Sequence, residues 1–317
     1  MNASIVSIAA LAASATALAP PPQKAAQLIA AAGLIASQLA SGQPVATAAV
    51  RIAMQTATGG SDASGAWIWA DAHDACEAAQ ILFVRKYFPA MRNRAKSPAA
   101  LLAMLARIAG LLPVHTRRSE EGQILQQFST QLPLAFAAAH AAAIAPADLV
   151  LEPSAGTGLL ALFAEQAGAA LALNELAETR ACLLQGLFPA APATRHDAAQ
   201  IHDRLDADVR PTIILMNPPF SVAAHIEGRV RDAAMRHVTS AFARLAEGGR
   251  LVAITGASLS PEAPAWREDE AAGKRTSFFA HVLALTADVV FPSWKLFLES
   301  PTDFTIPPER PKTQKIE

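Results

Sequence analysis

Apolar residues recur every three or four positions through the N-terminal third of the chain. The stretch 25–42, AAQLIAAAGLIASQLASG, has this spacing and stops at a Ser-Gly pair. The stretch 71–87 predicts a second helix, which we expect Pro89 to end. The stretch 97–113 predicts a third, with Ser97 as its N-cap and a proline at its first position. No strand pattern interrupts these stretches, so the sequence predicts an α-helical N-terminal region.

The pattern changes near residue 148, where short apolar runs begin to alternate with segments of helical spacing. The predicted strands lie at the start of 148–158, at 170–175, at 193–197, at 212–217 and at 250–255. Strands that alternate with helices of this length are typical of parallel, doubly wound sheets. The sequence therefore predicts an α/β protein with a mostly parallel, Rossmann-like sheet preceded by the helical region.

Composition and charge narrow the choice of partner and compartment. Of the 317 residues 52% are hydrophobic, and the formal net charge is −1, so any contact with nucleic acid has to be local. Cys76 and Cys182 have no neighbour at metal-ligand spacing, which predicts no metal site and a reducing compartment. Residues 1–20 are apolar but precede the first basic side chain, Lys24, so neither a secretory signal nor a membrane span is expected. We expect residues 1–20 to be a poorly ordered or helical lead-in, and the protein to be cytoplasmic.

Three predicted strands end in glycine-rich or polar sequence: EPSAGTG, NE and NPPF. The carboxyl ends of parallel strands form the ligand-binding edge of such a sheet. Gly156 and Gly158 let the backbone pass close to a ligand, and Thr157 can cap the following helix, whose N-terminus is positive. Glu175 ends the next strand, where a carboxylate accepts hydrogen bonds from both ribose hydroxyls of a nucleoside cofactor. The plainer alternative is a tight turn followed by a surface glutamate.

The glycine turn lacks the third glycine of the dinucleotide pattern GxGxxG. Glu152, in front of the turn, favours a cationic or amine-bearing cofactor over a pyrophosphate. EPSAGTG resembles the E/DxxxGxG motif of class I S-adenosylmethionine-dependent methyltransferases, and nicotinamide is a distant second choice. The resemblance implies S-adenosylmethionine as the cofactor, bound by Glu152, Ser154, Ala155, Gly156, Thr157, Gly158, Asn174 and Glu175.

The fourth predicted strand runs into NPPF at 217–220. This sequence resembles the (D/N)PP(Y/F) motif of amino-methyltransferases, which methylate exocyclic amines of adenine and cytosine and also certain amide and guanine nitrogens. The side-chain oxygen of Asn217 and the carbonyl of Pro218 can accept the two N–H bonds of the amine, which localises its lone pair toward the methyl group. Pro219 helps to fix the turn, and Phe220 offers a flat face to a base taken out of its stack. The alternative is that Asn-Pro-Pro is simply a good turn.

Two further matches extend the resemblance. Asp197 ends the short third strand, where the family places an acid that meets the adenine amine of the cofactor; a solvated loop aspartate is the alternative. The stretch 127–140, QFSTQLPLAFAAAH, is similar to the F/Y-x-T-P segment of enzymes that methylate DNA adenines, with Gln131 in place of the proline. This similarity implies that Phe128 and Thr130 lie near the methionine end of the cofactor.

Residues 60–265 resemble the N-terminal part of bacterial strawberry notch-like methylase/helicase proteins, in which an adenine-methyltransferase-like domain precedes a helicase portion. No GxxxxGK[ST] occurs here, so the resemblance implies the methyltransferase part alone, with a helicase domain or protein as its expected partner. After Ile254 the family fold needs a helix and an antiparallel hairpin, and 278–291 offers only one further helix or strand. The predicted organisation is a helical region 1–125, a methyltransferase domain 126–300 and a disordered tail 301–317.

Nucleic-acid contact is expected in the helical region, if anywhere. The stretch 85–96, RKYFPAMRNRAK, is basic with two interleaved aromatic residues, although a solvated helix face is the more common meaning of such a run. Three functions remain open from the sequence: methylation of an exocyclic amine in DNA, first of all adenine; the same chemistry on RNA guanine or protein glutamine; and a non-catalytic module that docks a helicase.

Overall fold

The structure is a computed structural model, and it describes residues 23–113, 130–218 and 233–254. The predictions for residues 1–20, for 278–291 and for the tail 301–317 lie outside the described residues. Among the helices that the structure describes, none is both long and apolar enough to cross a membrane.

The N-terminal region is helical, as predicted. Its helices are α2 (Gln23–Leu39), α3 (Thr47–Thr58), α4 (Trp69–Arg94) and α5 (Pro98–Ala109). Ser97 caps α5 as expected, because its hydroxyl accepts a hydrogen bond from the Ala100 amide at 3.2 Å.

The expectation that Pro89 ends its helix is wrong, because α4 continues through it to Arg94. A proline inside a helix removes one backbone hydrogen bond, but its fixed φ is helical. The preceding residue, Phe88, is buried, and its ring lies 5.6 Å from that of Phe163 and 6.4 Å from that of Phe136. Aromatic packing at this turn favours the continued helix.

The sheet confirms the predicted fold class. Its strands are β1 (Leu149–Glu152), β2 (Ala170–Asn174), β3 (Ala193–Thr194), β4 (Ile213–Met216) and β5 (Arg250–Ala253). Every described pair is parallel, and the order is β3-β2-β1-β4-β5. The direction of strand order reverses between β1 and β4, and in such sheets a ligand crevice opens at that switch.

Helices cover both faces of the sheet. They are α7 (Leu132–Ala141), α8 (Leu159–Gln166), α9 (Glu178–Leu187), α10 (Ile201–Arg204) and α11 (Ala233–Phe242). Alternate β1 residues point to different cores: Val150 packs with α7, α8 and the N-terminal helices, and Leu151 packs with α10 and α11.

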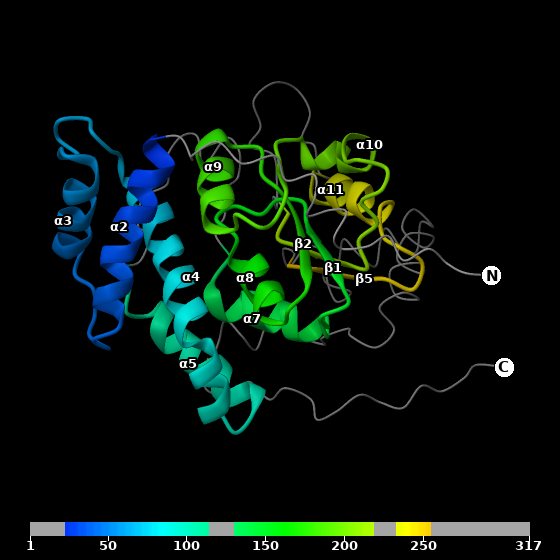
Figure 1. Cartoon of the computed structure of the whole chain (residues 1–317), viewed down its shortest axis with the longest axis horizontal. Helices are drawn as coiled ribbons and strands as arrows, with labels where there is room; N and C mark the ends of the chain where they lie inside the picture. The colour runs from blue at the N-terminus through cyan, green and yellow to red at the C-terminus, as the bar shows by residue number, and fades with distance from the viewer. Residues whose placement is uncertain (1–22, 114–129, 219–232, 255–317) are drawn as a thin grey trace, which may run out of the picture.

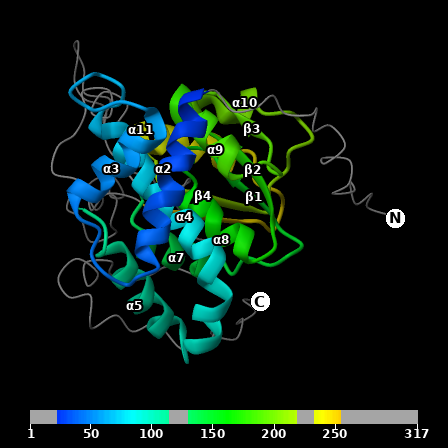
Figure 2. The ribbon, with the colours of Figure 1, turned by 60° about the vertical axis from the view of Figure 1, so that its left-hand side comes forward.

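The N-terminal helices share a core with the first of these faces. One cluster of buried side chains runs from Leu28 in α2 through α4 to β1, α8 and α9. Two views show α2 beside α9 and α4 beside α8 (Figures 1 and 2). Arg85 of α4 also forms a two-pronged ion pair with Glu165 of α8, at 2.7 and 3.1 Å. The helical region is therefore packed onto the sheet, while a domain boundary at residue 125 stays a prediction.

Candidate functional site

Asn174 ties the ends of three strands together. Its amide nitrogen donates to the carbonyls of Pro153 and His196, at 2.8 and 2.9 Å. Its oxygen accepts from the His196 amide and the Thr194 hydroxyl, both at 2.8 Å. These bonds use both donors and both lone pairs of a fully buried side chain. The Asn174 side chain therefore positions the strand ends, and contact of Asn174 with a cofactor stays a prediction.

The two turn glycines have different roles. Gly156 has a φ of 57°, and a β-carbon added there would meet open space. Gly158 has a φ of 95°, and a β-carbon there would lie 2.4 Å from a ring carbon of Phe188 and 2.9 Å from a methyl group of Leu184. Gly156 leaves room beside the turn, as expected for a ligand, whereas Gly158 is needed for packing against α9.

Glu175 directly follows β2 and lies against the glycine turn. One carboxylate oxygen accepts the Gly156 amide at 2.8 Å, and the other accepts the Ala177 amide at 2.8 Å. The residue is buried. Because each carboxylate oxygen can accept more than one hydrogen bond, these contacts fix its orientation without exhausting its capacity. Contact with a ribose stays a prediction.

Glu152 caps the helix that follows the turn. Its carboxylate accepts the Ala161 amide at 2.8 Å, and it is only 2% exposed. Burial raises the pKa of Glu152 well above its usual range; the Ala161 amide opposes the rise and Glu175 adds to it. The sequence assigned Glu152 to the cofactor and the cap to Thr157. In the structure Glu152 makes the cap and Thr157 does not.

Thr157 instead binds the helical region. Its hydroxyl donates to Glu77 of α4 at 2.6 Å, and both side chains are buried. Asp74, one turn earlier on α4, accepts two hydrogen bonds from the Arg180 guanidinium of α9, at 2.9 and 3.0 Å. Two acids of α4 therefore reach the glycine turn and the helix beside it.

Burial and neighbouring charges together set the pKa values in this cluster. The pKa of Asp74 is raised to about 6: burial raises it most, Arg180 lowers it, and the charges of Glu77 and Asp71 raise it. For Arg180, burial lowers the pKa, but the charges of Asp74, Glu77 and Glu175 outweigh burial and raise it. The Arg180 guanidinium is therefore charged although it is largely buried, and three acidic side chains surround it.

Asn217 lies directly after β4, on the same edge as the glycine turn. Its amide nitrogen donates to the Thr130 hydroxyl at 3.1 Å. Thr130 directly precedes the N-cap residue of α7, so this bond joins two segments that sequence reasoning had assigned to one site. Pro218 is buried beside it. Pro219, Phe220 and Phe128 lie outside the described residues.

Asp197 lies at the edge of this arrangement. The third strand ends at Thr194 rather than at residue 197, because His196 bonds to the Asn174 side chain instead of continuing the strand. Asp197 is exposed and caps a short 3₁₀ turn by accepting the Ala199 amide at 2.9 Å. Its contact with a cofactor stays a prediction.

A small cavity, which we call the strand-end hollow, brings several of these residues together. It is lined by Glu77, Thr130, Ser154, Ala155, Gly156, Thr157, Leu159, Arg180 and Asn217. Its volume is only about 20 Å³, far below the 300 Å³ or more of a typical small-molecule site. A nucleoside therefore fits only after the residues that line the hollow move apart. Glu152, Gly158, Asn174, Glu175 and Asp197 do not line the hollow.

Sequence reasoning missed Glu77 and Arg180. A usable pattern existed in α4, where Asp71, Asp74 and Glu77 recur every three residues, all of them buried. Acids at this spacing share one helix face. Buried acids are usually paired, so the pattern indicates partners elsewhere in the chain. Among the described residues, no group of three or more His, Cys, Asp or Glu side chains could hold a metal ion.

Comparisons with known proteins add little to this site. No protein-family model matches the sequence, and no curated protein matches it well enough to count as a relative. Among solved structures, PH1948 of Pyrococcus horikoshii, provisionally described as an RNA methyltransferase, has a TM-score of 0.39 and 21% identity, and the match covers 53% of this chain and 78% of that one. TrmN of Thermus thermophilus has a TM-score of 0.35 and 19% identity, covering 53% of this chain and 57% of that one. Similarity at this level carries no argument about activity.

Proposed function

We propose that the protein is an S-adenosylmethionine-dependent methyltransferase that acts on an exocyclic amine, first of all adenine in DNA. The observation that carries the proposal is the meeting of Asn217, at the end of β4, with the glycine turn in one hollow at the switch point of a parallel sheet. Crevices at such switch points bind nucleotide-like ligands.

The charges around the strand-end hollow fit this cofactor better than a dinucleotide. Glu77 lines the hollow and Glu175 holds the Gly156 amide, so acids face the turn from two sides. An acidic setting favours the sulfonium and ammonium groups of S-adenosylmethionine and disfavours a pyrophosphate. Arg180 also lines the hollow and can meet the cofactor carboxylate. The open space beside Gly156 is where the cofactor would pass the backbone.

In this proposal the cofactor supplies an activated methyl group, and the protein orients the amine. Asn217 accepts one N–H of the amine through its side-chain oxygen, and the carbonyl of Pro218 accepts the other. Both hydrogen bonds localise the nitrogen lone pair, so the rate gain comes from orientation and electrostatics rather than from a strong base. The Asn217–Thr130 hydrogen bond closes the hollow in the structure, and we expect it to break when the ligands enter.

Calorimetry tests the cofactor assignment. We expect S-adenosylhomocysteine to bind and NAD to bind weakly or not at all. Tight NAD binding together with no binding of S-adenosylhomocysteine would overturn the assignment.

A radiolabelled methyl-transfer assay on DNA, RNA and protein substrates tests the reaction. Asn217→Ala should keep its affinity for S-adenosylhomocysteine and lose about two orders of magnitude in transfer rate, the usual effect of removing one oriented polar group. Asn93→Ala, an exposed change on α4, is the control. If Asn217→Ala transfers methyl groups at the wild-type rate, NPPF is only a structural turn. Transfer only to RNA or protein corrects the substrate, and cofactor binding without any transfer indicates a non-catalytic module.

A further inference from the structure

A larger cavity lies near the opposite edge of the sheet from the strand-end hollow. Ala143 and Ile144, which lead into β1, and Ala167, which leads into β2, contribute to its wall, so it borders the amino ends of those strands. Its volume is about 450 Å³, within the range of about 300 to 1,000 Å³ that small-molecule sites occupy. We call it the phenylalanine cavity.

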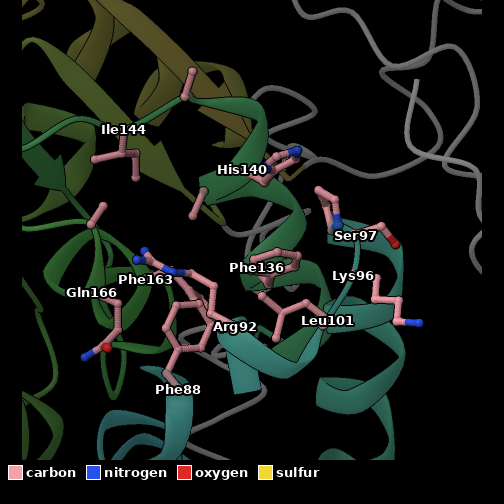
Figure 3. A pocket seen from close by; sticks show the side chains of 15 residues that line it. Phe88, Arg92, Lys96, Ser97, Leu101, Phe136, His140, Ile144, Phe163 and Gln166 are labelled. Atoms are coloured by element: carbon pink, nitrogen blue, oxygen red, sulfur yellow. The ribbon is translucent and has the colours of Figure 1, made fainter. Parts of the chain in front are cut away.

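Aromatic rings form the inner wall of the phenylalanine cavity (Figure 3). Phe88 of α4, Phe136 of α7 and Phe163 of α8 pack edge to face, with ring centres 5.5 to 6.4 Å apart. The His140 ring is stacked on Phe136, 5.9 Å away and within 17° of parallel. Leu101 and Ile144 extend the apolar surface. This wall suits a flat, apolar body.

The charged side chains that line the cavity are positive. Among the residues that the structure describes, Arg92 and Lys96 are the charged residues that line the cavity, and no acidic residue does. Both are exposed, and no ion pair within the described part of the chain involves either of them. Ser97 and Pro98 also line the cavity, so the positive end of α5 faces the same space.

The fate of the basic run 85–96 supports a specific role for Arg92 and Lys96. Arg85 is bound to Glu165 and lies over the Phe188 ring, and Lys86 lies over the Tyr87 ring. Those two cations have structural partners on the protein. Arg92 and Lys96, at the end of the run, instead line an apolar cavity. A helix face that served only for solvation would not need cations at such a place.

We propose that the phenylalanine cavity is a second binding site, for a planar aromatic anion such as a nucleotide or an aromatic carboxylate. The ring lies against the phenylalanine wall, the phosphate or carboxylate meets Arg92, and Lys96 adds positive charge along the cavity wall (Figure 3). A free nucleotide and a nucleotide within a single strand share this chemistry. The site is separate from the strand-end hollow, and it stands or falls independently of the proposed methyl transfer.

Calorimetry with the full chain tests the site. The probes are 1-naphthoate, AMP and a short single-stranded oligodeoxyadenylate, with adenosine as the uncharged control and S-adenosylhomocysteine added in excess to occupy the strand-end hollow. We expect 1-naphthoate and AMP to bind under these conditions and adenosine to bind more weakly. Tighter binding of the oligonucleotide than of AMP identifies a strand as the source, and equal or weaker binding identifies a free anion.

Matched variants locate the binding. Arg92→Gln combined with Lys96→Gln should weaken binding of 1-naphthoate and AMP about ten-fold or more, the scale of a lost charge-assisted contact. Arg94→Gln removes an exposed cation of the same run that does not line the cavity, and should change nothing. Ala167→Phe fills the cavity and should abolish binding while the thermal midpoint stays near that of the wild type. Absence of probe binding in the wild type, or equal loss in Arg94→Gln, overturns the proposal.

Discussion

Alanine substitutions at the two turn glycines should separate stability from cofactor binding. Gly158→Ala places a methyl group 2.4 Å from the Phe188 ring and 2.9 Å from Leu184, in a backbone conformation with φ of 95°. Both neighbours are buried, and the Arg85 guanidinium lies 4.8 Å over the Phe188 ring. The ring therefore cannot move without disturbing the contact between α4 and α9. Gly156→Ala has similar backbone strain and no steric neighbour.

The expected magnitudes follow from these contacts. The left-handed backbone costs about 1–2 kcal/mol for a residue other than glycine. Overpacking of a filled core adds about 1–3 kcal/mol. Gly158→Ala should therefore lower the free energy of unfolding by about 2–5 kcal/mol, a large share of the 5–15 kcal/mol typical of a folded domain. Gly156→Ala should lower it by only about 1–2 kcal/mol, from backbone strain alone.

Urea unfolding and calorimetry with S-adenosylhomocysteine check both variants. Gly158→Ala should shift the urea midpoint strongly while its folded fraction still binds the ligand, because Gly158 does not line the strand-end hollow. Gly156→Ala should shift the midpoint less than Gly158→Ala and fail to bind, because the methyl group enters the space beside the turn. Wild-type binding by Gly156→Ala would refute the ligand role, and an unchanged midpoint for Gly158→Ala would refute the packing argument.

Substitutions at three further residues test other contacts. Because the pKa of Glu152 is raised, its contribution to stability is complete at low pH and is lost as pH rises through the folded-state pKa. The urea midpoint of the wild type should therefore decline as pH rises from acid to neutral. Glu152→Gln should flatten that decline. Glu77→Ala leaves the Thr157 hydroxyl without its acceptor and should cost about 1–3 kcal/mol by urea unfolding, whereas Glu77→Gln should cost less because it keeps an acceptor. Arg85→Gln should leave oligonucleotide affinity in a filter-binding assay unchanged, because Glu165 already holds the guanidinium. A marked loss of affinity would show that Arg85 contacts nucleic acid after all.

Much of the sheet could be predicted because its strands are buried on both faces and read as short apolar runs. The segments before Glu152, Asn174 and Asn217 are such runs, and each ends in a polar residue where the sheet ends. The edge where the site lies follows directly from this pattern. The meeting of Thr130 with Asn217 was also within reach, because the resemblance to adenine methyltransferases placed both near one cofactor.

The division of roles among the site residues could not be predicted, because it depends on contacts distant in sequence. Gly156 and Gly158 are equivalent in the motif, and only the approach of Phe188 makes the second a packing residue. Asn174 has its hydrogen-bonding groups filled by segments around 153 and 194–196. A motif indicates which residues lie at a strand end, but not which of them use their hydrogen-bonding groups to hold that end together.

The acids of α4 explain why the helical region belongs with the sheet. Asp71 pairs with Lys24 of α2 at 2.7 Å, Asp74 binds Arg180 of α9, and Glu77 binds Thr157 of the glycine turn. Each acid is buried, and an unpaired buried charge is strongly destabilising. Removal of the helical region would leave Arg180 without its ion-pair partner and the turn without the side chain that holds Thr157. It would also expose the apolar face of α8 and α9 that α4 and α2 cover. The geometry of the glycine turn therefore depends on a helix that lies about eighty residues earlier in the chain, so a fragment that begins at residue 126 lacks part of its own candidate site.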